Sequence, residues 1–182
     1  MSGIVSLFEC DIEPILALLP ELQYAWAAEP WRNSMPHLPR RDTESIFIRQ
    51  QPGSRPRDAL HQLASVATQY HQGPLSLAVE AIYQHTQGRP ARAMLVRLRP
   101  SGVIEPHTDE GTYAEATTCF HLPIVTNPGA WMEVDGNRYH LTAGTVFAVD
   151  KHALHSAGND GDEATISLVV DVHPDSPGLF AG

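Results

Sequence analysis

The feature that most constrains this fold is a series of short β-prone segments between residues 91 and 173, separated by turns. Four of the intervening stretches combine glycine with proline, serine, asparagine or aspartate: 100–102, 127–129, 135–137 and 159–161. Glycine adopts positive φ at little cost, so such stretches favour tight turns. Six segments are predicted to be strands: 93–99, 117–125, 130–134, 138–141, 145–149 and 164–172. Many short strands at this spacing predict a mainly β sandwich, jelly roll or barrel.

The residues before this region predict a mixed support of strands and helices. Residues 4–8 and 43–50 are predicted to be strands, and residues 31–41 are rich in turn formers. Asp11 is expected to cap a helix that carries apolar residues from Ile12 to Leu19. A second helical piece is expected over residues 21–28.

Helical spacing returns between residues 57 and 87, where Pro74 divides the pattern into two helices and Gly88 ends it. No internal repeat or second domain is visible. We therefore expect a single domain over residues 1–182. Residues 1–90 are expected to form a strand and helical support region, and residues 91–173 a jelly-roll metal-binding core.

Composition excludes several classes of protein. The chain has 182 residues, of which 42% are hydrophobic and 18% charged, as in ordinary globular proteins. A net charge of −9 argues against nucleic acid or an anionic membrane as a partner. Two cysteines are too few for a disulfide framework, and neither a signal-peptide pattern nor a membrane-spanning apolar run is present. The cytoplasm is the expected compartment, and the oligomeric state is not indicated.

The residues with the clearest chemistry are His107, Asp109 and His155. Side chains two apart on a strand face the same side, so His107 and Asp109 can contact one ion together. The strand over 145–149 is expected to end in a polar loop that delivers His155. A lone histidine is usually a surface or core residue, but two imidazoles and one carboxylate suit ferrous iron with open coordination positions. The sequence therefore predicts that these three residues are metal ligands and the catalytic centre of a non-haem iron oxygenase.

Several separate motifs occur in the order typical of one family. Residues 95–102 leading to 107–109, with 121–128, 139–144 and the tail from His155 to Asp171, resemble the aspartyl/asparaginyl β-hydroxylase family, which includes bacterial proline hydroxylases. Residues 42–46 resemble an upstream element of the family. The resemblance implies a mainly β, double-stranded β-helix fold (jelly roll, cupin-like) with supporting N-terminal helices. It also implies Fe(II), 2-oxoglutarate as cosubstrate, and hydroxylation of an amino acid or peptide-like side chain.

The chain departs from this family at two positions. Arginine is usual about ten residues after the second histidine and two residues before the His-Leu-Pro element, but Thr165 and Cys119 stand there. A buried carboxylate needs a cationic or hydrogen-bonding partner. Arg97 is expected to be the substitute, with the Thr165 and Ser167 hydroxyls as further cofactor-binding groups. Arg99, or Arg138 with His140, are alternatives, and all of these could equally lie on a solvated strand face.

Two other functions remain open from the sequence. A cupin-like metalloenzyme or oxygenase could use the same metal ligands without 2-oxoglutarate, and a barrel could bind a ligand without catalysis. A small amino-acid-like or peptide substrate is expected in the leading case.

Overall fold

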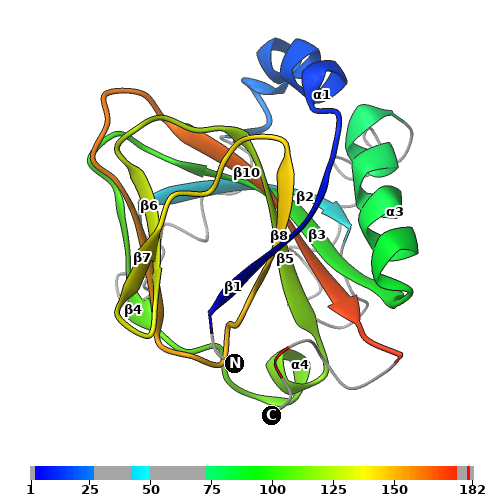
Figure 1. The fold of residues 1–182 in the computed structure, drawn as a ribbon. Helices are drawn as coiled ribbons and strands as arrows, with labels where there is room; N and C mark the ends of the chain where they lie inside the picture. Colours follow the sequence, from blue (N-terminus) through cyan, green and yellow to red (C-terminus); the bar gives the residue numbers. More distant parts are fainter. Residues whose placement is uncertain (1–2, 27–41, 50–72, 176–179, 181–182) are drawn as a thin grey trace, which may run out of the picture.

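A computed structural model describes residues 3–26, 42–49, 73–175 and 180, which form two antiparallel β-sheets (Figure 1). The larger sheet has the order β1-β8-β5-β10-β3-β2 and the smaller sheet the order β4-β9-β6-β7. The six strands of the larger sheet are β1 (Ile4–Glu9), β8 (Thr145–Val149), β5 (Thr118–Val125), β10 (Thr165–His173), β3 (Arg89–Leu98) and β2 (Thr43–Arg49). The four strands of the smaller sheet are β4 (Val103–His107), β9 (His155–Asn159), β6 (Ala130–Val134) and β7 (Asn137–Tyr139). The predicted mainly β, jelly-roll architecture is confirmed.

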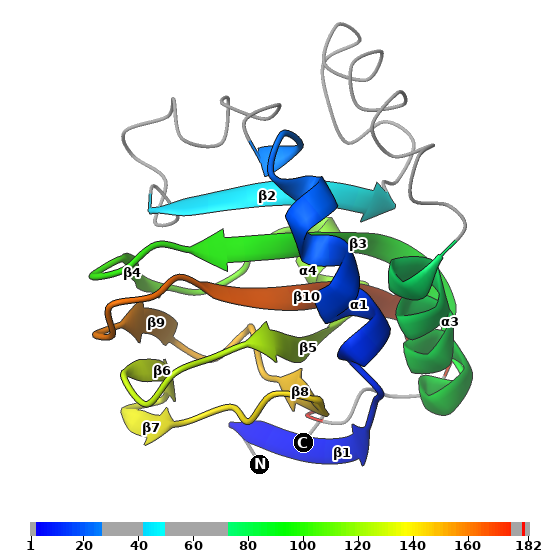
Figure 2. The ribbon, with the colours of Figure 1, turned by 90° about the horizontal axis from the view of Figure 1, so that it is seen from above.

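Helices cover one face of the six-stranded sheet (Figure 2). They are α1 (Glu13–Leu18), a short 3₁₀ turn η1 (Leu19–Leu22) and α3 (Pro74–Thr86), while α4 (Thr112–Glu115) is a single turn elsewhere. The expected cap, Asp11, lies one residue before the helix N-cap, where its carboxylate accepts a hydrogen bond from the Glu13 N–H at 3.1 Å. Of the described helices, none is long and apolar enough to cross a membrane.

The helix α3 begins and ends where its sequence predicts. Pro74 occupies the first turn, in which a missing N–H costs nothing, and Gln87 ends the helix in the left-handed region at φ 52°. Its buried residues recur at helical spacing: Leu75, Ala78, Val79, Ile82 and Tyr83. Leu77 of the same helix is 71% exposed and lies outside this buried set.

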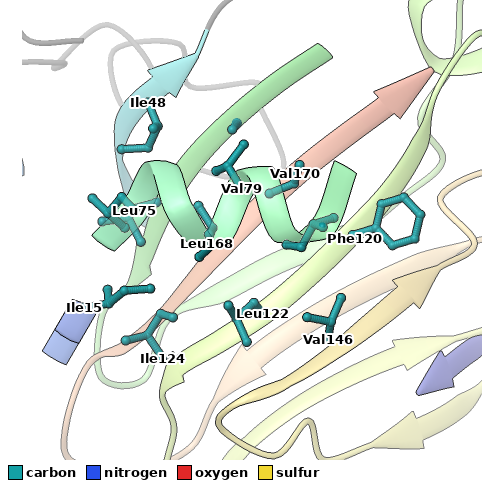
Figure 3. Packing of buried hydrophobic residues seen from close by; sticks show 14 of the residues in the cluster. Ile15, Ile48, Leu75, Val79, Phe120, Leu122, Ile124, Val146, Leu168 and Val170 are labelled. Carbon is teal, nitrogen blue, oxygen red and sulfur yellow. The ribbon is translucent and has the colours of Figure 1, made fainter. Parts of the chain in front are cut away.

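The strand β10 separates the core from the interior between the sheets. Leu168 and Val170 pack with Leu75 and Val79 of α3 in the main hydrophobic core (Figure 3). The alternate residues Ser167 and Val169 point to the opposite face and line a pocket between the two sheets. Because strand side chains alternate, one strand both anchors the helices and forms the pocket wall.

The structure adds two strands that the turn pattern did not indicate. The segments 103–107 and 155–159 form β4 and β9, although neither was among the six predicted strands. β4 contains Pro106, and β9 consists of small and polar residues, so neither has a strong strand pattern. The described part of residues 1–90 supplies β1 and β2 to the same sheet as the core. The predictions for residues 31–41 and 57–72 lie outside the described residues.

Replacement of Leu168 by alanine tests the core. Leu168 is fully buried beneath the helices, so Leu168→Ala should lower the free energy of unfolding by about 2–5 kcal/mol through lost apolar contacts and a cavity. The exposed Leu77 provides a matched control, and Leu77→Ala should change stability by less than about 0.5 kcal/mol. Urea denaturation followed by circular dichroism measures both. Equal effects of the two substitutions would contradict the packing described here.

Candidate metal centre

The pairing of β4 with β9 places two histidines side by side. His107 ends β4, His155 begins β9, and the two residues are direct partners in the antiparallel register. Their rings lie 4.2 Å apart between centroids at an interplanar angle of 48°. Asp109 completes the group, since one ligand atom from each of the three residues lies within 4.8 Å of the others. The structure therefore brings together all three predicted metal ligands.

A bulge in β4 sets the direction of the His107 side chain. The register passes from Ile104 opposite Ala157 to His107 opposite His155, so β4 has one extra residue between these pairs. Pro106 lies within this stretch of an edge strand, and bulges and edge strands are the places where a sheet tolerates proline. As a result, Ile104 and His107 both line the same pocket although they are three residues apart.

Backbone carbonyls hold both imidazoles in one orientation. Nδ1 of His107 lies 2.7 Å from the Glu105 carbonyl oxygen, and Nδ1 of His155 lies 3.0 Å from that of Ala153. A carbonyl oxygen can only accept, so each Nδ1 carries the proton and each Nε2 offers a lone pair. Nε2 of His107 lies 3.7 Å from Oδ1 of Asp109. This arrangement of two imidazole nitrogens and a carboxylate could hold a divalent metal ion.

Two details of the expected placement are corrected. His155 does not come from a loop but starts strand β9, where it also pairs with Val134 of β6. Asp109 lies beyond the end of β4, and its backbone N–H donates to the carbonyl of Lys151 at 2.9 Å. The two-residue alternation of a strand therefore does not account for the approach of Asp109 to His107.

The pocket between the sheets has two adjoining lobes. The metal lobe contains the three candidate ligands with Arg92, Cys119 and Lys151, and the second, named the Thr165 lobe, contains Thr165 and Ser167. Their volumes are about 70 and 90 Å³. A cavity that holds one water molecule has a volume of roughly 10–15 Å³ on the same scale. Each lobe is therefore several times larger than a water site and has room for part of a small organic molecule. Six of the described residues line both lobes: Val96, Ile104, His121, Met132, Ala157 and Val169.

The expected cofactor-binding residues are only partly brought together. Thr165 and Ser167 lie side by side on the wall of the Thr165 lobe. Arg97 lies on the opposite face of β3, where Nε donates to Glu44 at 2.7 Å and the guanidinium stacks over the Trp26 ring at 4.6 Å. The alternation of β3 explains this, because Val96 and Leu98 take the pocket-facing positions. This placement does not favour Arg97 as a partner for a ligand in the pocket.

The alternative cations also have other contacts. Arg99 is exposed and pairs with Asp42 at 2.6 Å. Arg138 stacks over the Trp131 ring at 3.9 Å and lies 3.6 Å from Glu133. Nδ1 of His140 is hydrogen-bonded to the Ala130 carbonyl. None of these three residues lines either of the two lobes.

Sequence reasoning missed the charged groups that do face the metal lobe. Arg92 lies two and four residues before Met94 and Val96, on the same pocket face of β3, and this spacing was its only signal. Lys151 lies two residues after the end of β8 and is only 4% exposed, whereas a lysine in a turn is normally solvated. Nothing in the sequence around Lys151 indicates its burial.

Arg92 is neutralised by a buried carboxylate. Nη2 and Nε of Arg92 lie 2.7 and 2.9 Å from the same oxygen of Asp171, which also accepts a hydrogen bond from the Tyr113 hydroxyl at 3.0 Å. Burial opposes the guanidinium charge, but Asp171 more than offsets this and raises the pKa of Arg92. Burial, with the charge of Asp171, raises the pKa of the Tyr113 hydroxyl above its usual range. Arg92, Asp171 and Tyr113 therefore form one cluster, held by an ion pair and a hydrogen bond to the same carboxylate oxygen.

Cys119 occupies one of the positions where the resembled family has arginine. It packs against Phe47, Met94 and Val169 and is 7% exposed. Burial and the neighbouring Asp171 raise the pKa of its thiol well above the usual value. Cys119 is therefore a protonated, apolar part of the pocket wall rather than a thiolate.

Comparison with known proteins places this fold and site in context. A family model described as aspartyl/asparaginyl beta-hydroxylase matches residues 67–174, more than half of the chain. The structure resembles an oxidoreductase of the 2OG-Fe(II) oxygenase family from Burkholderia pseudomallei, with a TM-score of 0.55, 16% identity, and coverage of 94% of this chain and 84% of that one. It also resembles the collagen prolyl hydroxylase of Paramecium bursaria Chlorella virus-1, with a TM-score of 0.51, 9% identity, and coverage of 94% and 96%.

At these identities the structural likenesses establish the jelly-roll fold alone. A comparison with curated proteins gave no match. The family model covers the segments that supply all three candidate metal ligands. This chain belongs to the aspartyl/asparaginyl beta-hydroxylase family.

Proposed function

We propose that this protein is an Fe(II)- and 2-oxoglutarate-dependent hydroxylase of an amino acid or peptide-like side chain. The observation that carries the proposal is the convergence of His107, Asp109 and His155 beside a pocket between two sheets. Two nitrogens and one carboxylate on one side of an ion are the donor set preferred by non-haem Fe(II) enzymes that keep positions open. The family and the fold support the same class of chemistry.

The residues present fit a divalent iron ion. Both imidazoles are held with Nε2 as the donor, and Asp109 adds the one negative charge that such a site usually has. When bound, iron with open coordination positions supplies the activation of dioxygen. The protein contributes the orientation of the ligands, through the carbonyls of Glu105 and Ala153, and a pocket wall that excludes water.

The pocket also fits a small dicarboxylic acid. The residues shared by the two lobes are mainly apolar, with Val96, Met132 and Val169 among them, so a ligand there is largely desolvated. Its carboxylates then need hydrogen bonds or cations. The Thr165 and Ser167 hydroxyls stand at one side of the pocket, and Arg92 and Lys151 stand at the other.

One observation favours a second candidate, a metal-dependent oxygenase that does not use 2-oxoglutarate. Among the residues that the structure describes, those lining the Thr165 lobe include neither lysine nor arginine. Bidentate arginine is the usual partner of a buried carboxylate, and this lobe offers hydroxyls instead. Under this candidate the same metal would act directly on a substrate held in the pocket.

Replacement of a ligand tests the metal site. His107→Ala should weaken binding of Mn(II), a redox-stable substitute for Fe(II), by more than the roughly 10- to 100-fold that loss of an outer partner costs. Isothermal titration calorimetry measures the affinity. His140→Ala is the matched control, since His140 lies outside the three-residue group, and it should leave the affinity unchanged. Equal binding by both variants would refute this site.

Titration with the cosubstrate separates the two candidate functions. Addition of 2-oxoglutarate to the anaerobic Fe(II) protein should give a weak visible charge-transfer band, and oxygen consumption should depend on 2-oxoglutarate. Oxygen consumption that proceeds without any 2-oxo acid, and no band at saturating concentrations, would support the second candidate. His107→Ala should abolish both signals, because the iron then lacks one of its three protein ligands.

A further inference from the structure

We propose that Lys151 is the binding group for a carboxylate of the ligand that occupies the metal lobe. This inference rests on the proposed function, because the ligand is the acid or amino acid that reaches the metal. Lys151, just beyond the end of β8, would then take the role of carboxylate partner that the sequence predicted for Arg97 of β3.

Lys151 is buried with little compensation for its charge. Its side chain lines the metal lobe, and the residue is only 4% exposed. Within residues 3–26, 42–49, 73–175 and 180, no carboxylate lies within salt-bridge distance of Nζ. An ammonium in such surroundings costs free energy unless an opposite charge is close, so the lobe favours an incoming anion.

The hydrogen bonds of Lys151 leave donors available to a ligand. Nζ donates to the Thr117 hydroxyl at 2.5 Å, and that hydroxyl in turn donates to the Tyr113 carbonyl at 2.8 Å. The Tyr113 ring lies 5.7 Å from Nζ. A lysine ammonium has three N–H groups, and these contacts use one of them for hydrogen bonding.

The other charged groups of the lobe do not compete for this anion. Arg92 and Asp171 neutralise each other, and Asp109 belongs to the group that could hold the metal. Cys119 is a neutral thiol because burial raises its pKa. Lys151 is therefore the cation of the metal lobe that has no carboxylate partner among the residues described.

The backbone around Lys151 links it to the metal ligands. The Asp150 carboxylate accepts the N–H groups of His152 and Ala153 at 3.1 and 3.4 Å, which closes a turn after β8. The Lys151 carbonyl accepts the N–H of Asp109. Because the same residue holds a metal ligand through its backbone and faces the lobe with its side chain, a ligand could contact the metal and Nζ together.

Two pairs of probes identify the source of the carboxylate. Titrations of the Mn(II)-loaded protein compare 2-oxoglutarate with 2-oxopentanoate, which lacks the second carboxylate, and L-proline with L-prolinamide, which lacks a carboxylate. The variants are Lys151→Met, Lys151→Gln, which keeps an N–H donor without the charge, and the control Arg97→Met on the other face of the sheet.

The expected result is a loss of about 10- to 100-fold in affinity for one charged probe in both Lys151 variants. The variants should then bind the charged and uncharged members of that pair equally, while Arg97→Met behaves as the wild type. A loss confined to 2-oxoglutarate assigns Lys151 to the cosubstrate, and a loss confined to L-proline assigns it to the substrate.

Unchanged affinities in both Lys151 variants, or no carboxylate binding by the wild type, would overturn this inference. A wild-type protein that fails to bind Mn(II) would instead refute the proposed function, so the two failures are distinguishable. The thermal unfolding midpoint of ligand-free Lys151→Met provides a further check. It should equal or exceed that of the wild type, because a buried charge without a partner is removed. A marked fall would indicate a purely structural lysine.

Discussion

The site depends on one backbone interaction, the antiparallel pairing of β4 with β9. This pairing sets His107 opposite His155 and brings two imidazoles within reach of one ion, although 47 residues separate them in the chain. Both strands are short. β4 lies at the edge of the smaller sheet, and β9 is held on its other side by pairing with β6. The candidate metal centre is therefore stabilised by the ladder of the smaller sheet rather than by the side chains that form it.

The six-stranded sheet supplies the second half of the site because both of its faces are covered. On β10, Leu168 and Val170 contact the helices, while Ser167 and Val169 face the pocket. Side chains alternate between the two faces of β3 in the same way. Arg97 therefore contacts Glu44 on one face, and Arg92 lines the metal lobe on the other. A shift of either strand by one residue would exchange these roles, so the hydrophobic core and the chemistry of the pocket are fixed by the same register.

Much of the fold follows from turns and alternation in the sequence. Glycine-containing turns at 100–102 and 135–137 mark the ends of real strands, and the His-x-Asp motif with a distant histidine identified the three residues that converge. The face of β3 on which Arg97 lies could not be predicted in this way. Both faces of β3 are apolar, so the alternation that distinguishes inside from outside in a solvated sheet gives no direction here.

Other features required the three-dimensional structure. The bulge at Pro106 places Ile104 and His107 on one side against the two-residue period, and no local signal predicts which of two adjacent residues is the extra one. The burial of Lys151 arises from its contacts with Tyr113 of α4 and with Thr117, which are distant in the sequence.

The hydrogen bond from the Asp109 N–H to the Lys151 carbonyl has a consequence for selectivity. It joins the segment after β4 to the segment after β8, so the position of the candidate ligand Asp109 is linked to that of Lys151. A molecule that spans both must have a suitable number of bonds between its two polar ends. The protein would then discriminate among acids by backbone length, and adaptation to a longer acid would require a change in this connection rather than in the pocket walls.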